Sequence, residues 1–148
     1  MKRIYPDQPI IGIGIVIVRN CHIVLIKRGN EPSKGKWTIP GGLVELGESV
    51  EAAVIREAKE ETCLDVEKPE LIDVVGNIDF DEAGKIKYHY VIVDYLVHVK
   101  GGDINAASDA EELRWVPFDE VECYNLTASF RLFFRKNRKK LEKANSYC

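Results

Sequence analysis

The feature that most limits the possible folds is an apolar run near the N-terminus. Residues 10–18 read IIGIGIVIV, and every one of them is glycine or β-branched. Side chains of a strand alternate between the two faces of a sheet, and here both sets are apolar. The run is also too short to cross a membrane as a helix, which needs roughly 20 apolar residues. We therefore expect a central strand that is covered on both faces.

Turn residues and apolar periodicity divide the rest of the chain into further elements. Residues 23–28, 71–78, 86–99 and 113–116 are expected to be strands, with a break at Pro69 before the second of them. Residues 50–62 and 127–143 are expected to be helices, the later one with an apolar stripe at Phe130, Phe133 and Phe134. Strands on both sides of a helix indicate an α/β or α+β domain with helices packed on a mixed sheet. The strand order stays open.

Composition places the chain among ordinary globular domains. It has 148 residues, of which 45% are hydrophobic and 30% charged, so one domain over residues 1–148 is expected. The formal net charge of -3 gives no general attraction to nucleic acid or to a membrane surface. The four cysteines, at positions 21, 63, 123 and 148, are scattered and indicate neither a zinc site nor a disulfide framework. With no cleavage site typical of a signal peptide, a cytoplasmic location is expected.

Three glutamates on the first expected helix are unfavourably placed. At roughly 100° per residue, Glu61 lies about 40° from Glu57, and both continue the apolar stripe of that helix, with Glu60 at its border. Like charges three and four residues apart repel, and unpaired charge on a poorly hydrated face is costly. A hard divalent cation would remove both difficulties, because Mg²⁺ takes oxygen ligands. The alternative is a solvated helix in which Arg56 and Glu60 form an ordinary ion pair.

The spacing around these glutamates resembles a known family motif. Residues 42–64 read GLVELGESVEAAVIREAKEETCL and resemble the box of the Nudix (MutT-type) hydrolases. The matching positions are Gly42, Glu48, Arg56, Glu57, Glu60, Glu61 and Leu64. Cys63 departs from the pattern, because the family has glycine there, at a helix end where φ is often positive. The segments WTIPGG at 37–42 and RWV at 114–116 also resemble the family.

The resemblance implies a fold, an enzyme class and a metal site. The fold would be the Nudix fold, an α/β/α sandwich with a mixed central β-sheet. The activity would be that of a Nudix pyrophosphohydrolase, which hydrolyses acid anhydrides in phosphorus-containing compounds and uses Mg²⁺, with Mn²⁺ as a substitute. Glu57, Glu60 and Glu61 would be the metal ligands, and Gly42, Glu48 and Arg56 would orient the loop.

The resemblance also implies a proton acceptor for the attacking water, whose pKa a bound metal lowers. Glu60 or Glu61 could take the proton, and family members often use a further acid from a loop outside the box. Asp109, Glu111 and Glu112 are candidates for that acid, of which Glu112 is favoured. Each of them can equally be a solvated loop charge.

The substrate is less closely defined than the chemistry. The chain is most like the small Nudix members named ADP-ribose pyrophosphatases, which implies cleavage of ADP-ribose or a related nucleotide sugar into a nucleoside monophosphate and a sugar phosphate. A proline that marks typical ADP-ribose enzymes would fall near Phe80 and is absent, and the tyrosine that marks diadenosine-polyphosphate enzymes offers no clearly better match. A MutT-like nucleoside triphosphate pyrophosphohydrolase is an alternative, and a non-catalytic Nudix-fold ligand sensor is another.

Candidate substrate-binding residues lie on the expected strands and loops. Arg28 could hold a phosphate, while Trp37, Phe80, Tyr88 and Tyr90 could flank a base, although aromatic residues are more often part of a core. The expected partner is a small nucleotide, with no membrane partner. The C-terminal basic run does not change this expectation, because its phenylalanines fit a core stripe and nucleic-acid binding is not expected. Family members are frequently homodimers, but no interface is visible in the sequence.

Overall fold

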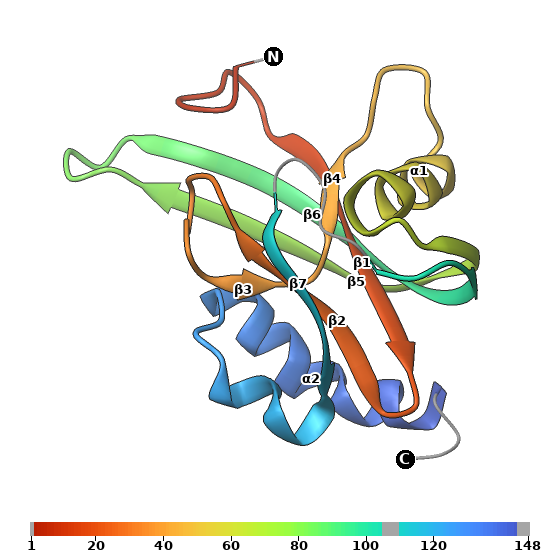
Figure 1. The fold of residues 1–148 in the computed structure, drawn as a ribbon. Coiled ribbons are helices and arrows are strands. Elements are labelled where there is room, and N and C mark those ends of the chain that lie inside the picture. The colour runs from red at the N-terminus through yellow and green to blue at the C-terminus, as the bar shows by residue number, and fades with distance from the viewer. Residues whose placement is uncertain (1, 105–109, 145–148) are drawn as a thin grey trace.

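The computed structural model describes residues 2–104 and 110–144, without the side chains of residues 110 and 111. Figure 1 shows a twisted sheet with one long helix on each side. The strands are β1 (Ile10–Arg19), β2 (His22–Arg28), β3 (Trp37–Thr38), β4 (Gly41–Leu43), β5 (Asp65–Phe80), β6 (Ile86–Gly101) and β7 (Ala110–Pro117). The helices are α1 (Val50–Thr62), the 3₁₀ helix η1 (Phe118–Cys123) and α2 (Ala128–Ala144).

Strand β1 organises the sheet, whose order is β3-β2-β1-β6-β5. It runs parallel to β6 and antiparallel to its other neighbours, so the sheet is mixed. On its other side β1 changes partner along its length. Residues 12–14 pair with β4, whereas residues 18–19 pair with β2. Strands β2, β3 and β7 therefore diverge from β4, and the sheet splits beside the middle of β1.

Two apolar layers cover β1, as its sequence predicts. Ile13, Ile15 and Ile17 pack on the side of α1, with Ala53 and Val54 in the same cluster. The alternate position Val16 belongs to the opposite cluster, which contains the phenylalanines of α2. The predicted α/β/α sandwich with a mixed central sheet is confirmed (Figure 1).

The expected elements are present, with two differences: the strand at Pro69 and three short elements. The predicted bounds of α1 agree with the structure, and Ser Oγ at position 49 caps it by accepting the Ala52 N–H at 3.1 Å. Pro69 does not end a strand. Strand β5 begins at Asp65 and passes Pro69 through a register shift between Glu67 and Glu70, because a bulge leaves out the ladder bond that proline cannot make. The short elements β3, β4 and η1 were not predicted.

The cysteines are only partly as expected. Cys63 and Cys123 are free thiols, but Cys21 is disulfide-bonded, so the expectation that no disulfide forms is wrong at this residue. Spacing along the chain does not reveal which thiols meet in space. No helix in the described part of the chain is both long and apolar enough to span a bilayer.

The position where the family has glycine takes a conformation that suits glycine. Cys63 ends α1 with φ 65° and ψ 8°, in the left-handed region, and its N–H donates to the Lys59 carbonyl at 3.0 Å. A side chain in this region places Cβ close to a backbone carbonyl, at a cost of about 1 kcal/mol. At position 63 the residue type differs from the family motif, but the backbone has the left-handed conformation that glycine favours.

We predict that Cys63→Gly stabilises the protein by about 0.5–1 kcal/mol, because it relieves this strain without removing the capping hydrogen bond. Denaturant unfolding would measure the change. Cys63→Ala is the matched control, since it removes the thiol but keeps Cβ. Equal stability of the glycine and alanine variants would contradict the explanation.

Candidate active site

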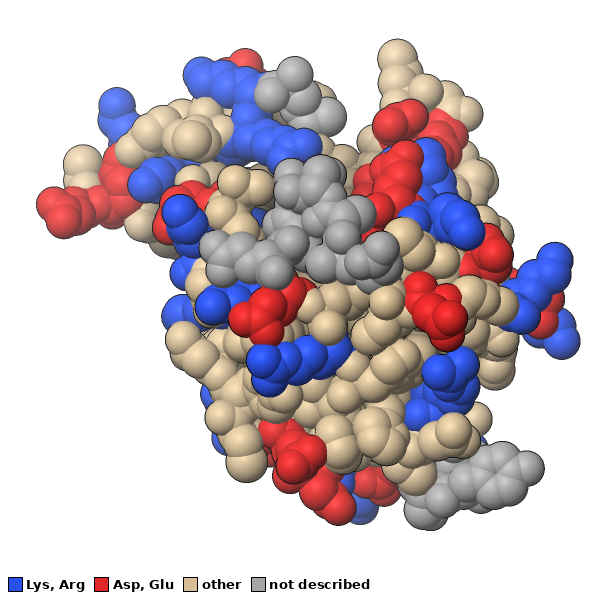
Figure 2. Space-filling view, in the orientation of Figure 1, with Lys and Arg blue, Asp and Glu red and all other residues tan. Residues whose placement is uncertain are grey.

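Arg56 connects α1 to the loop that precedes it. Its guanidinium holds Glu48 with two hydrogen bonds, from Nε to Oε2 at 2.7 Å and from Nη2 to Oε1 at 2.9 Å. Nη2 also donates to the Leu43 carbonyl at 3.1 Å, and the Glu45 N–H donates to Glu48 Oε1 at 3.1 Å. The loop is therefore fastened to the helix at two places. Figure 2 shows acidic and basic side chains side by side in this region, at the upper right.

These contacts change the proton affinities of both partners. The hydrogen bonds from Arg56 are the largest cause that lowers the pKa of Glu48, to about 2, with a smaller contribution from the Glu45 N–H. The Glu48 carboxylate in turn raises the pKa of Arg56, which stays cationic. A bidentate pair between planar groups fixes direction as well as distance. The loop consequently has one preferred orientation on α1.

Glu57 is inserted between α1 and β4. Its carboxylate occupies the space that a side chain at Gly42 would need, so any larger residue there would displace it. Arg56 Nη1 donates to Glu57 Oε1 at 2.9 Å. Burial is the largest influence on Glu57 and raises its pKa, with Arg56 acting in the opposite direction. Gly42 thus makes room for a half-buried acid.

Glu60 and Glu61 complete the acidic edge of the helix. Glu60 Oε2 accepts from Arg56 Nη1 at 3.1 Å, and Glu61 Oε2 accepts from the Gly41 N–H at 2.8 Å. With Glu57 they form an all-oxygen donor set, which fits the chemistry of a hard divalent cation. In their present orientation, however, no three histidine, cysteine or acidic side chains among the described residues converge on a metal position. Arg56 binds two of the three carboxylates.

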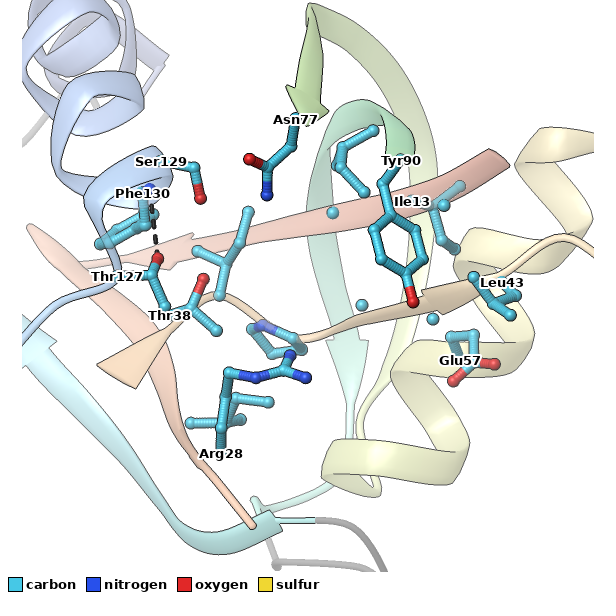
Figure 3. A pocket seen from close by; sticks show the side chains of 18 of the residues that line it. Ile13, Arg28, Thr38, Leu43, Glu57, Asn77, Tyr90, Thr127, Ser129 and Phe130 are labelled. Atoms are coloured by element: carbon cyan, nitrogen blue, oxygen red, sulfur yellow. Dashed lines mark hydrogen bonds between the residues drawn. The ribbon is translucent and has the colours of Figure 1, made fainter. Parts of the chain in front are cut away.

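A cleft of about 730 Å³ opens where the sheet splits. It is lined by residues of β1 to β6, by the three glutamates of α1 and by the beginning of α2. In Figure 3, Glu57 lies at one end and Thr127, Ser129 and Phe130 lie at the other. Arg28 and Tyr90 point into the space between them. The acidic helix edge and a mixed polar and aromatic pocket therefore belong to one continuous space.

Only some of the other predicted site residues line the cleft. Of the predicted substrate contacts, Arg28 lines the cleft, and its Nε donates to the Pro32 carbonyl at 2.6 Å. Trp37 and Tyr88 are buried, Phe80 is exposed, and none of the three is part of the lining.

Glu112, the favoured proton acceptor, also lies outside the lining and accepts from Arg114 Nη2 at 2.7 Å. Asp109 and the side chain of Glu111 lie outside the described part of the chain.

Several cleft residues were not predicted from the sequence. Asn77, Thr127 and Ser129 line it, and so does Asp94, which is only 4% exposed. Tyr90, by contrast, was a predicted base contact and does line the cleft. Burial raises the pKa of Asp94 to about 7, and repulsion from Asp73 adds to the effect. One signal was present in the sequence, since Asp94 interrupts the apolar run VIVDYLV of an expected strand. Polar loop and helix residues carry no such signal.

Comparison with known proteins identifies the family. The NUDIX domain model matches residues 9–136. The chain belongs to the NUDIX domain family. A solved MutT NUDIX hydrolase from Burkholderia pseudomallei superposes with a TM-score of 0.73 at 36% identity, covering 85% of this chain and 95% of that one. The family model includes the box at 42–64, and the structural likeness to a solved NUDIX hydrolase agrees with it.

Two curated NUDIX relatives indicate different substrates. The ADP-ribose pyrophosphatase of Methanocaldococcus jannaschii is 40% identical over 114 residues, which cover 77% of this chain and 65% of that protein. The match thus spans slightly less than two thirds of the relative. A putative 8-oxo-dGTP diphosphatase 2 of Mycobacterium tuberculosis is 33% identical over 114 residues, covering 70% of this chain and 77% of that protein.

The buried Asp94 predicts an unusual dependence of stability on pH. Its pKa is raised from 3.8 to about 7 in the folded protein, so folding favours the protonated form. This contribution to stability is complete below about pH 4 and is lost as the pH rises towards 7, by at most about 4 kcal/mol. Asp94→Asn should remove the loss, making the variant more stable than the parent at pH 8 but not at pH 4. Denaturant unfolding at both pH values measures this, and parallel pH profiles would contradict it.

Proposed function

We propose that this NUDIX protein hydrolyses a phosphoanhydride bond in a nucleoside diphosphate linked to a second moiety, with ADP-ribose or a related nucleotide sugar as substrate. The products would be a nucleoside monophosphate and a sugar phosphate. Divalent metals are generally used in this family. For this chain we propose Mg²⁺, with Mn²⁺ as a substitute, held by Glu57, Glu60 and Glu61.

The observation that carries the proposal is the continuity of the cleft. The box glutamates form one end of it, Arg28 projects into its middle, and an apolar and hydroxyl-lined pocket forms the other end (Figure 3). Its volume of about 730 Å³ lies in the range of sites for whole small-molecule ligands. A diphosphate near Arg28 would place its phosphorus atoms between the acidic helix edge and the pocket. Such a layout suits a substrate with phosphates in the middle and organic groups at its ends.

The protein side chains divide the work of hydrolysis. Arg28 can bind a phosphate oxygen through the guanidinium nitrogens that it does not use on Pro32. Glu48 and Arg56 hold the loop and leave the carboxylates of α1 facing the cleft. A bound divalent cation supplies charge neutralisation and a more acidic water. A carboxylate must take the proton of that water, and Glu60, Glu61 and Glu112 stay the candidates.

The charge pattern of α2 supports a small-molecule substrate over a nucleic acid. Arg135 and Arg131 pair with Glu122, Arg138 with Asp119, and Lys136 with Asp73. Basic side chains that are already paired within the chain release fewer counterions from a phosphate backbone. This pairing supports the interpretation of the basic run as a solvated helix face.

Two alternatives come from the same family. The relative named as an 8-oxo-dGTP diphosphatase supports cleavage of nucleoside triphosphates, with pyrophosphate as a product. A ligand sensor would bind nucleotides without turnover, although this chain keeps all four box glutamates, Glu48, Glu57, Glu60 and Glu61.

Incubation of the protein with ADP-ribose, other nucleotide sugars and nucleoside triphosphates, each with Mg²⁺, separates these possibilities by their products. We expect AMP and ribose 5-phosphate from ADP-ribose. Pyrophosphate from triphosphates alone would favour the MutT-like alternative, and binding without turnover would favour the sensor.

We predict that Glu60→Gln lowers turnover by roughly 10²-fold or more while leaving the melting temperature nearly unchanged, because it removes one metal-binding charge without changing volume. Glu51→Gln is the matched control, since Glu51 is on the same helix but does not line the cleft. The same assay on Glu112→Gln tests its role as proton acceptor. Full activity of the Glu60 variant would exclude Glu60 from the site.

A further inference from the structure

Asp94 is a buried acid with no evident structural task. It lies in the middle of β6, and among the described residues it is the only buried side chain that is acidic or basic. Its position within the apolar stretch VIVDYLV of this strand is costly for a carboxyl group that lacks a partner. The surroundings of Asp94 show how the fold accommodates a carboxyl group there.

The sheet leaves space for this carboxyl group. Gly14 of β1 is the register partner of Asp94, and the Asp94 side chain fills the volume that a side chain at position 14 would take. Ile39 closes the same space from the loop between β3 and β4. Substitution of Gly14 by any larger residue would collide with the acid. The fold therefore accommodates Asp94 through a glycine on the neighbouring central strand.

The oxygens of Asp94 are available to a ligand. Among the described residues, no donor forms a hydrogen bond to either oxygen. Every fully buried side-chain nitrogen or oxygen in this part of the chain has a partner. The Asp94 oxygens are therefore not fully enclosed. Since Asp94 lines the cleft, its carboxyl group is reached from the cleft. The missing hydrogen bonds must come from water or from a bound molecule.

The charges around Asp94 favour its protonated form. On β5, the facing acid Asp73 repels it and is itself bonded by Lys136 and Asn137 of α2. On β2, Arg28 extends into the cleft, but no ion pair joins it to Asp94. The glutamates of α1 that line the same cleft are also negative. Burial and repulsion together hold the pKa of Asp94 near neutrality, at about 7.

We infer that Asp94 is the specificity-determining residue that hydrogen-bonds the edge of the nucleobase in the cleft. Ile92, Phe130 and Phe133 line the same cleft and provide apolar walls for a planar ring. A protonated carboxyl group presents one donor and one acceptor side by side. Adenine offers the complementary pair, an exocyclic amino group next to a ring nitrogen. This inference rests on the proposed function, because it assumes a nucleotide substrate.

Binding of AMP, a reaction product that needs no turnover, tests the inference. Purine riboside 5′-monophosphate is the matched ligand, because it lacks only the amino group that would donate to Asp94. By calorimetry we expect the parent protein to bind AMP about tenfold more tightly than this analogue, as for one lost hydrogen bond. Asp94→Asn keeps one donor and one acceptor and should retain the preference, whereas Asp94→Ala should lose it.

The pH dependence gives a second readout. Ionised Asp94 has no donor, so AMP affinity of the parent should fall between pH 6 and pH 8.5 relative to Asp94→Asn at the same pH. Comparison with the variant cancels the titration of the phosphate itself. Asp73→Asn is the control, since Asp73 is outside the cleft lining. It should keep the preference for AMP and move the midpoint to lower pH, because a repelling charge is removed.

The inference is overturned if Asp94→Ala keeps the preference for AMP, or if it weakens AMP and the analogue equally, which would place the carboxyl group against the ribose. Absence of AMP binding by the parent also overturns it. Hydrolysis of ADP-ribose by the same preparations separates the two claims. Turnover without a contribution of Asp94 rejects base recognition alone, whereas lack of turnover of any nucleotide rejects the proposed function.

Discussion

The structure depends on the burial of β1 between two helical layers. Its alternate side chains enter two separate apolar clusters, one under α1 and one under α2. Because β1 is fixed from both faces and by β6 along one edge, its other edge can change partner from β4 to β2 without loss of the sheet. That change opens the cleft beside a strand that is buried on both faces. A site on such a strand keeps its geometry better than one built only from loops.

Arg56 reduces the repulsion between the glutamates of the box. Carboxylates at neighbouring positions of one helix repel each other, and the guanidinium lies within ion-pair distance of Glu48, Glu57 and Glu60. The pair with Glu48 is bidentate and also fixes the loop, whereas the contacts with Glu57 and Glu60 are single. A cation that binds Glu57 and Glu60 competes with Arg56 for these two only. The loop can therefore stay fastened while Glu57 and Glu60 reorient.

Carboxyl groups in and beside the cleft differ in their preferred ionisation. At the α1 end, a nearby guanidinium holds Glu48 ionised and opposes the effect of burial on Glu57. Among the described residues Asp94 has no cation partner, and burial makes the neutral form accessible near pH 7. Charged oxygens suit a divalent cation, whereas a neutral acid suits hydrogen bonding to an uncharged ring. One cleft can thus provide separate places for the polar and the organic parts of a substrate.

The sequence by itself determined the longer strands, both long helices and the family motif, because local periodicity, turn chemistry and fixed spacing specify them. It did not determine the strand order, the strand that continues past Pro69, or the disulfide at Cys21. Nor did it bring Asp94 together with Gly14, Arg28 and the start of α2, which come from four distant segments. Only tertiary structure decides such contacts, since burial and hydrogen-bond partners are properties of neighbours in space and not of neighbours in the chain.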